Sequence, residues 1–494
     1  MEVESLPPEV SRRNLSPQAI TAPMPNDPIF QRLTFPSGLV VRNRLFRSNL
    51  SGRFDNYDGS GNEIRINWEE RFAKGGVGAI ISSYTPVSVR GRILTHYAMI
   101  DHDDKIPFWS KLVRRVNQHD DCKFIMQLSH SGRQQDQGGV ENRYHKALSS
   151  TSKKDYFHGI LCRAMSPGEI DEVVEQFGRG AKRARQAGVH GVELHGANGY
   201  LITQFLSSAI NDRDDSYGGS LRNRYRFLRQ IIRSIRDHAG PDYHLQLKIS
   251  AEDHNNALYP WMGRGNRLED TIQICKWAQQ DGVHALHISS GSIFPHPKNP
   301  AGDFPLSDAV AWYDSMLNAG VNARMNYWIF THWPFGPLFR WWWKFRSGVK
   351  QDRIHEGVSL KEAAEIRRHV SIPVIVTGGF QHAEVIRRAL SGMVDAVSIG
   401  RPLIANPDLP KLFQAGMDWK DAALAAAQGL DWPLKNRHPC SYCNRCLLND
   451  LENPLGCYDI DRFDSYEELI AEVMSVYHPE EAEAPALAAN DGAA

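Results

Sequence analysis

The chain is 494 residues long and its charges balance, with 57 Lys plus Arg against 57 Asp plus Glu. A balanced charge creates no global field that would attract nucleic acid, so we expect no nucleic-acid partner. No run approaches the roughly 18 continuous apolar residues of a membrane span, and the start lacks the pattern of a secretory signal. Seven cysteines in so long a chain do not suggest a disulfide framework. We therefore expect a cytoplasmic protein.

Strand-like and helix-like segments alternate along the middle of the chain. The β-branched runs lie at 45–50, 77–83, 123–129, 191–195, 243–250, 285–289, 372–377 and 394–399. Helical patterns lie between or after them, at 65–74, 107–119, 167–187, 223–238, 267–281, 359–370, 383–391 and 407–415. Eight strands, each followed by a helix, imply a parallel sheet, and eight is the number that closes a barrel. The predicted fold class is therefore α/β, a (β/α)8 or TIM barrel.

Composition divides the chain into this barrel and its additions. Residues 1–27 are rich in Pro, Ser and charge and predict a disordered arm, and residues 478–494 predict a disordered tail. The barrel is expected over 28–435, and a Cys-rich extension over 436–477. An insertion of about 292–356 separates the sixth strand from its helix.

The insertion is rich in aromatic side chains and positive charge. It holds six of the twelve tryptophans: Trp312, Trp328, Trp333, Trp341, Trp342 and Trp343. Three interpretations stay open: a lid over an apolar substrate, a surface for a membrane or a partner, or packing against the barrel or a second subunit. Peripheral membrane contact through 327–346 and a homo-oligomer are both compatible with it. Because the insertion follows a strand's carboxyl end, we expect it near the mouth of the barrel.

Two strand ends carry the residues of a phosphate site. Strand seven ends in Gly378-Gly379 and strand eight in Gly400-Arg401. Adjacent glycines let backbone N–H groups approach an anion, and an arginine adds a charged fork. The loops after strands seven and eight are the common phosphate position in barrels. We predict phosphate binding here, with a tight turn at Gly378-Gly379 as the alternative.

The end of the fourth strand gathers side chains suited to oxygen and proton chemistry. The sequence HGANGYL places His195, Asn198 and Tyr200 on the strand end and its loop. A histidine and an amide can donate to one oxygen, and a tyrosine O–H can deliver a proton. The alternative is a structural histidine beside a packed tyrosine.

These segments resemble the old yellow enzyme family, the NADH:flavin oxidoreductases. The most specific motif is HGANGYL-x2-QFLS-x3-N-x-R-x-D-x-YGG, supported in the expected order by NRLFRSNLSGRFD, GAIISSYTPVSVRGR, QLSHSGR and VSIGRPLIANPDL. The resemblance runs from about Asn43 to Pro410, outside the insertion. It implies an FMN barrel with a ping-pong cycle, in which NAD(P)H reduces the flavin and leaves, and the oxidant takes the same face.

The resemblance implies a role for individual cofactor-binding residues. Gln127 would bind the pyrimidine edge of the flavin, and Ser51 would lie near its N5/O4 side. Gly379 and Arg401 would hold the FMN phosphate. Lys248 stands where the family usually has Arg, and would lie by the N1/O2 region without a planar fork.

The resemblance also implies how a substrate is held. His195 and Asn198 would bind the electron-withdrawing oxygen of the acceptor, and Tyr200 would protonate the carbon α to it while hydride enters at β. The segment Ser48-Asn49-Leu50-Ser51 replaces the family's frequent AP-[ML]-[TC], which resembles the 2,4-dienoyl-CoA reductase branch. His296 lies near where that branch places a second acid, or is an incidental loop histidine.

Four of the seven cysteines fall within 18 residues, in the spacing C-x2-C-x2-C-x10-C. They are Cys440, Cys443, Cys446 and Cys457. Three thiolates in a tight loop plus a distant fourth suit a [4Fe–4S] cluster. The related branch carries C-x2-C-x3-C-x11-12-C there, and this chain is one residue short in the second gap. Structural zinc and free thiols stay open as alternatives.

We thus predict an enzyme of the NAD(P)H:flavin oxidoreductase, ene-reductase type. It would reduce an activated C=C bond in a small apolar substrate carrying a carbonyl or thioester. Two alternatives stay open: a non-redox phosphate-binding barrel that acts as a lyase or isomerase, and a membrane-associated dehydrogenase of the same flavin family.

Overall fold

The structure is a computed structural model and describes residues 26–135, 146–156, 159–315, 317, 320–347, 356–421, 438–449 and 453–479. The predicted N-terminal arm and C-terminal tail lie almost wholly outside the described residues. The last part of the predicted insertion and the start of the predicted extension also lie outside them.

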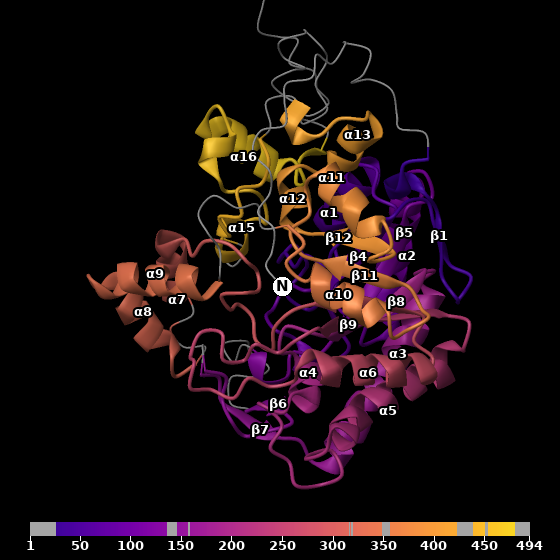
Figure 1. Ribbon diagram of the computed structural model, residues 1–494, viewed down its shortest axis with the longest axis vertical. Coiled ribbons are helices and arrows are strands. Elements are labelled where there is room, and N and C mark those ends of the chain that lie inside the picture. The colour runs from indigo at the N-terminus through magenta and orange to yellow at the C-terminus, as the bar shows by residue number, and fades with distance from the viewer. Residues whose placement is uncertain are drawn as a thin grey trace, which may run out of the picture.

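In the described part of the chain, parallel strands close an eight-stranded barrel, as the sequence predicts (Figure 1). Around the barrel the order is β10-β11-β12-β3-β4-β5-β8-β9. The strands are β3 (Leu45–Arg47), β4 (Ala79–Pro86), β5 (Lys123–Ser129), β8 (Gly191–Gly196), β9 (His244–Ser250), β10 (Ala285–Ser289), β11 (Val374–Thr377) and β12 (Ala396–Ile399).

Burial on both faces explains why these strands read as nearly continuous apolar runs. All residues of β8, β9, β10 and β12 are buried, for example. The first strand is shorter than predicted, because the chain leaves the sheet after Arg47, where Ser48 to Ser51 turn toward the cavity described below. The second runs further, to Pro86, past an irregular register between Ile81 and Tyr84.

Helices pack around the barrel and bury their apolar stripes on it. They are α1 (Glu63–Lys74), α2 (Ile106–Asn117), α3 (Pro167–Gln186), α4 (Leu201–Leu206), α5 (Leu221–Ala239), α6 (Leu268–Gln280), α10 (Leu360–Arg367), α11 (Ala383–Leu390), α12 (Arg401–Ala405) and α13 (Leu409–Gln414). α3 shows why the local sequence forms a helix and packs one face on the barrel. Ser166 and Glu169 form a reciprocal capping box at its start, and Phe177 and Ala181 lie fully buried on one face.

Two small sheets add to the barrel and have no counterpart in the predicted elements. β1 (Leu33–Thr34) and β2 (Val40–Val41) form an antiparallel hairpin. Its buried side chains join the apolar layer inside the barrel that includes Phe46 and Ile125. β6 (Ala147–Ser149) and β7 (Cys162–Ala164) pair in parallel. Strands of two or three residues are too short to show a period, so the sequence pattern does not reveal them.

The insertion and the extension fold as helical additions. Between β10 and α10 lie α7 (Leu306–Ser315), α8 (Ala323–Thr331) and α9 (Phe335–Ser347), which stand out beside the barrel in Figure 1. α15 (Arg445–Leu448) and α16 (Tyr466–Met474) follow the barrel. Among the described helices, none has the length and apolarity needed to cross a bilayer.

Candidate functional site

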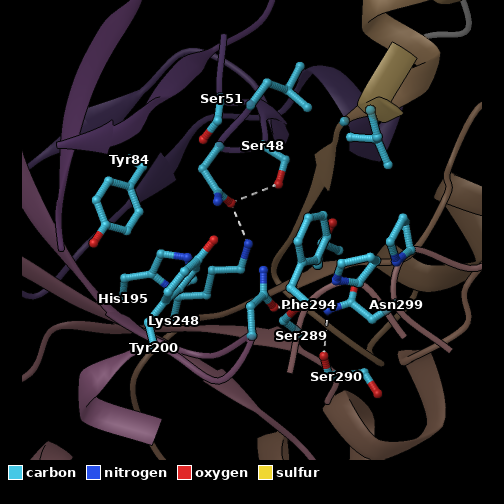
Figure 2. Close-up of a pocket in the computed structure, with 18 of the residues that line it drawn as sticks. Ser48, Ser51, Tyr84, His195, Tyr200, Lys248, Ser289, Ser290, Phe294 and Asn299 are labelled. Atoms are coloured by element: carbon cyan, nitrogen blue, oxygen red, sulfur yellow. Dashed lines mark hydrogen bonds between the residues drawn. The ribbon is translucent and has the colours of Figure 1, made fainter. Parts of the chain in front are cut away.

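A cavity opens at the carboxyl ends of the barrel strands, where the functional groups of such barrels gather. Nine of the residues singled out in the sequence line it together: Ser51, His195, Asn198, Tyr200, Lys248, Gly378, Gly379, Gly400 and Arg401. Figure 2 shows His195, Tyr200 and Lys248 grouped on one side of this cavity, with Phe294 and Asn299 opposite.

His195 ends β8 and is buried against Tyr200, with 4.5 Å between the two ring centroids. Burial, followed by the charge of Lys248, holds the pKa of His195 well below its ordinary value. The ring is therefore neutral at physiological pH and carries one N–H donor. Its Nδ1 is buried and has no hydrogen-bond partner among the described residues. A buried ring nitrogen of this kind fits a site that is completed by a ligand.

The turn after β8 is held in an unusual backbone shape. Asn198 has φ +59° and Gly199 φ +78°. A Cβ on Gly199 would stand 2.2 Å from the backbone oxygen of Ser292, so only glycine fits there. The Asn198 Oδ1 accepts a hydrogen bond from Asn299 Nδ2 at 2.9 Å. With its carbonyl oxygen held, the Asn198 side chain offers its N–H donors to the cavity. Tyr200 then starts α4.

Lys248, near the end of β9, is buried and donates to Asn49 Oδ1. Burial lowers its pKa to about 8, against the opposing charge of Glu193. Asn49 belongs to the segment that leaves β3, and Ser48 Oγ also donates to its Oδ1 at 3.3 Å. One positive group is thus fixed at the wall of the cavity, beside the segment of Ser48 and Ser51 (Figure 2).

The loops after β11 and β12 form the other end of the cavity. Gly379 has φ +76°, which favours glycine, and a Cβ on Gly378 would come within 2.9 Å of the backbone nitrogen of Val358. Arg401 starts α12 and donates to Asn444 Oδ1. Its guanidinium also lies 5.2 Å from the centre of the Tyr442 ring. Close-packed glycine backbone beside an arginine fork is a cradle for a phosphate.

Two predicted site residues do not line the cavity. Gln127 is fully buried within the barrel and donates to Glu193 Oε1 at 2.7 Å, while its Oε1 has no partner among the described residues. His296 is fully buried, and burial lowers its pKa to about 3. A Cβ on Gly291 would stand 1.8 Å from His296 Nε2, so this ring packs under the loop after β10. A flavin contact of Gln127 and a substrate contact of His296 stay predictions.

Several cavity residues were assigned no role from the sequence, among them Asn49, Tyr84 and Asn299. Asn49 and Asn299 act as the hydrogen-bond partners described above. Tyr84 lies with its ring centroid 5.2 Å from that of Tyr200, and its hydroxyl donates to Gly91 O at 2.6 Å. Tyr84 falls in GAIISSYTP at a strand end, a position that could have drawn attention to it. Asn299 lies in the insertion, where no strand end marks it.

All four clustered cysteines, Cys440, Cys443, Cys446 and Cys457, line a second, smaller cavity on the far side of Arg401. Arg462 donates to Cys457 Sγ at 2.8 Å. Burial raises the pKa of Cys440 to about 11, with the neighbouring thiols adding to the effect. Tyr442, within this loop, donates to Gly379 O at 2.5 Å, so the cysteine loop and the glycine cradle are directly joined.

Within the described ranges, no three cysteine, histidine or carboxylate side chains stand close enough to bind one metal ion. Neither the zinc alternative nor the [4Fe–4S] cluster is therefore shown by the described residues. A four-iron cluster is larger, because each thiolate binds a different iron.

Comparison with known proteins places the chain in a family. The model of the NADH:flavin oxidoreductase / NADH oxidase family matches residues 28–307, more than half of the chain. The chain therefore belongs to this family, and the predicted old yellow enzyme membership and flavin oxidoreductase class are confirmed. It is 31% identical over 380 residues to an NADH oxidase of Thermoanaerobacter brockii, covering 76% of this chain and 49% of that protein. The chain thus spans about half the length of that relative.

A further relative is an NADPH dehydrogenase of Halalkalibacterium halodurans. It is 36% identical over 277 residues, covering 55% of this chain and 77% of that protein. Two solved structures share the fold at 22% sequence identity. A 2-naphthoyl-CoA reductase complex has a TM-score of 0.66, covering 87% of this chain and 56% of its own. An old yellow enzyme homologue from Zymomonas mobilis has a TM-score of 0.58, covering 78% and 92%. The predicted barrel is confirmed.

Proposed function

We propose that this protein is an NAD(P)H-dependent, FMN-containing reductase of activated C=C bonds. One observation carries the proposal: His195, Asn198 and Tyr200 line the same cavity as Lys248 and the glycine cradle with Arg401. The cradle suits the phosphate of FMN, and the neighbouring strand ends suit its ring system. FMN held there would supply the hydride-transfer chemistry that links NAD(P)H to the acceptor.

The roles of the protein side chains follow from their chemistry. The neutral His195 ring and the Asn198 amide each offer N–H donors to an oxygen of the acceptor, where negative charge develops during reduction. The buried Lys248 ammonium stabilises negative charge on the reduced cofactor. Tyr200 O–H supplies the proton that completes the addition.

The expected substrate is small and apolar, activated by a carbonyl or thioester. The support is the apolar part of the cavity wall, made by Ile93, Leu94, Ile160, Phe294, Trp312 and Leu447. Such a wall favours the hydrocarbon part of a substrate, while the polar pair at β8 selects the oxygen.

The change Tyr200→Phe tests this reaction. We expect reduction of the bound flavin by NADPH to be unchanged, and its reoxidation by a cyclic enone to slow by about a hundredfold or more, since a positioned acid contributes about 10²–10⁴. Anaerobic stopped-flow absorbance measures the two half-reactions separately.

Tyr84→Phe is the matched control, because the Tyr84 hydroxyl is already donating to Gly91 and its pKa is raised by burial. Both half-reactions should survive that change. Equal slowing of both half-reactions in Tyr200→Phe would contradict the assigned role. Failure of the protein to bind FMN at all would favour the non-redox lyase or isomerase instead.

We also propose that Cys440, Cys443, Cys446 and Cys457 bind a [4Fe–4S] cluster. The support is their convergence on one buried cavity and the Arg462 hydrogen bond to Cys457 Sγ, of the kind that tunes such clusters. Anaerobically purified protein should contain about four iron and four sulfide per chain. Protein without iron or sulfide would contradict the cluster, and zinc in their place would restore the alternative.

A further inference from the structure

The helical insertion has an inner face that is fully used in packing. Phe304, Tyr313, Phe330 and Trp343 are buried together between α7, α8 and α9. Two side chains of α9 connect this small core to the loop after β9 by hydrogen bonds. Trp342 Nε1 donates to Leu258 O at 3.1 Å, and the Arg346 guanidinium donates to the backbone oxygens of residues 256 and 257. The inner face therefore accounts for the folding of the insertion.

The outer face of the same helices is also apolar, but it is exposed. We call it the α8–α9 face, and it consists of Trp328, Trp333, Phe335, Leu338, Trp341 and Phe345. Trp333, at the turn between the helices, is 85% exposed, and Trp341 and Phe345 are 62% and 63% exposed. The rings of Trp328 and Phe335 lie 5.2 Å apart and join the two helices. A contiguous exposed surface of large apolar side chains marks an interaction site.

The charged residues of α8 and α9 themselves are all basic. From Ala323 to Ser347 the sequence has four basic residues, Arg324, Arg340, Lys344 and Arg346, and no acidic one. Asp303 pairs with both Arg340, at 2.5 Å, and Lys344, at 3.2 Å, so one carboxylate faces two cations. Arg346 donates to uncharged carbonyl oxygens. The segment formed by α8 and α9 therefore keeps a net positive charge.

We propose that the α8–α9 face docks the protein on an anionic phospholipid surface. Tryptophan rings flanked by Lys and Arg are the composition that membrane interfaces favour. A second copy of the chain fits less well, because a twofold interface would set the same cations against each other without acidic partners. At 1.5 Å per residue, the 13 residues of α9 span about 20 Å, short of the roughly 30 Å hydrocarbon layer, so the helix would lie on the bilayer.

Docking in this way would place the catalytic cavity at the lipid surface. Trp312 of α7 lines that cavity, and α7 shares its small core with α8 and α9. An apolar substrate dissolved in the bilayer would then reach the cavity without crossing water. The docking itself does not depend on the proposed reaction, so the two can fail separately.

Vesicle sedimentation of the full-length, flavin-containing protein tests the proposal. We expect the protein to sediment with phosphatidylcholine vesicles that contain phosphatidylglycerol, much less with phosphatidylcholine alone, and to be released by salt. The triple change Trp333→Ser, Trp341→Ser and Phe345→Ser should weaken binding at least about tenfold, since each large ring buries substantial apolar area. Flavin content and thermal unfolding should stay unchanged, because these three side chains lie outside the small core.

Tyr466→Ser is the matched control, because Tyr466 is 64% exposed on α16, which lies at a distance from α9 in Figure 1. This variant should bind vesicles as the parent does. The proposal is overturned if the parent binds neither kind of vesicle, binds both equally, or binds as well after the triple change. It is also overturned if sedimentation velocity without lipid shows a dimer that the triple change dissociates, since the face would then be a contact between copies.

Discussion

At the scale of single residues, the site depends on side chains whose ionisation is set by burial. Lys248 is the clearest case. Its ammonium lies 3% exposed inside the barrel mouth, where loss of water lowers its pKa to about 8 from an ordinary 10.5. The unfolded chain binds more protons than the folded one between about pH 8 and about pH 10.5. Stability of the flavin-free protein therefore rises with pH across this window, as far as Lys248 is concerned.

The change Lys248→Met should remove this dependence. Below about pH 8 the parent carries a buried charge that the variant lacks, and the variant should be more stable by up to ~3 kcal/mol. This difference in the free energy of unfolding should shrink as the pH rises toward about 10.5. Over that range Lys248 of the folded parent releases its proton, so the parent no longer buries a charge. Urea unfolding of both flavin-free proteins near pH 7 and near pH 9.5 measures it. An equal difference at both pH values would contradict the assigned pKa shift.

The sequence could predict site residues where they belong to one contiguous motif. It could not predict the hydrogen-bond partners of these residues. HGANGYL contains His195, Asn198 and Tyr200 in six residues, so the strand end and its turn bring all three to one wall. The Lys248 partner, Asn49, comes from a segment 199 residues away. Gln127 shows the same limit for a residue inside the barrel. Its place at the barrel strand was predicted, but Glu193 from the neighbouring strand decides where its amide is held.

At the scale of elements, the loops after β11 and β12 and the cysteine loop are joined to one another by hydrogen bonds at Gly379 and Arg401. Arg401 lines both the main cavity and the cysteine cavity. Its guanidinium lies over the ring of Tyr442 and donates to Asn444, so the C-terminal extension holds the side chain that is predicted to bind the FMN phosphate. The extension therefore contacts the predicted phosphate site directly.

The change Arg401→Met tests the cradle. FMN affinity of the apoprotein should fall by about 10–150-fold, since a hydrogen bond to a charged group contributes about 1.5–3 kcal/mol. Riboflavin, which lacks the phosphate, should bind the parent and the variant equally. Fluorescence titration of both flavins separates the two cases. Equal loss of both affinities would mean that Arg401 acts through Tyr442 and Asn444 and not on the phosphate.

Elements could be predicted where burial imposes a pattern over many residues. The barrel strands are buried on both faces and the helices on one, so each leaves a period in the sequence. The β1–β2 hairpin and the β6–β7 pair have strands of two or three residues, and their pairing partners come from the fold. The helices of the insertion are apolar on two faces, and that pattern does not say which face is packed.

At the scale of the whole molecule, one barrel carries two additions, the insertion and the C-terminal extension, beside the cavity at its strand ends. The cavity lies at the strand ends, the cysteine loop is hydrogen-bonded to Gly379 on its wall, and the aromatic insertion supplies Trp312 to the same wall. The insertion and the extension come from distant parts of the chain, yet α7 and α15 contact each other. Both additions thus bear on the site, and not only on the stability of the barrel.

We propose that this barrel holds FMN and passes electrons from NAD(P)H to an activated C=C bond. An anaerobic absorbance titration of the purified full-length protein tests it most directly. We expect a flavin spectrum that bleaches on adding NADPH or NADH and returns on adding an enone. Protein that shows no flavin band and takes up no added FMN would contradict the account, as would a flavin band that neither nicotinamide bleaches.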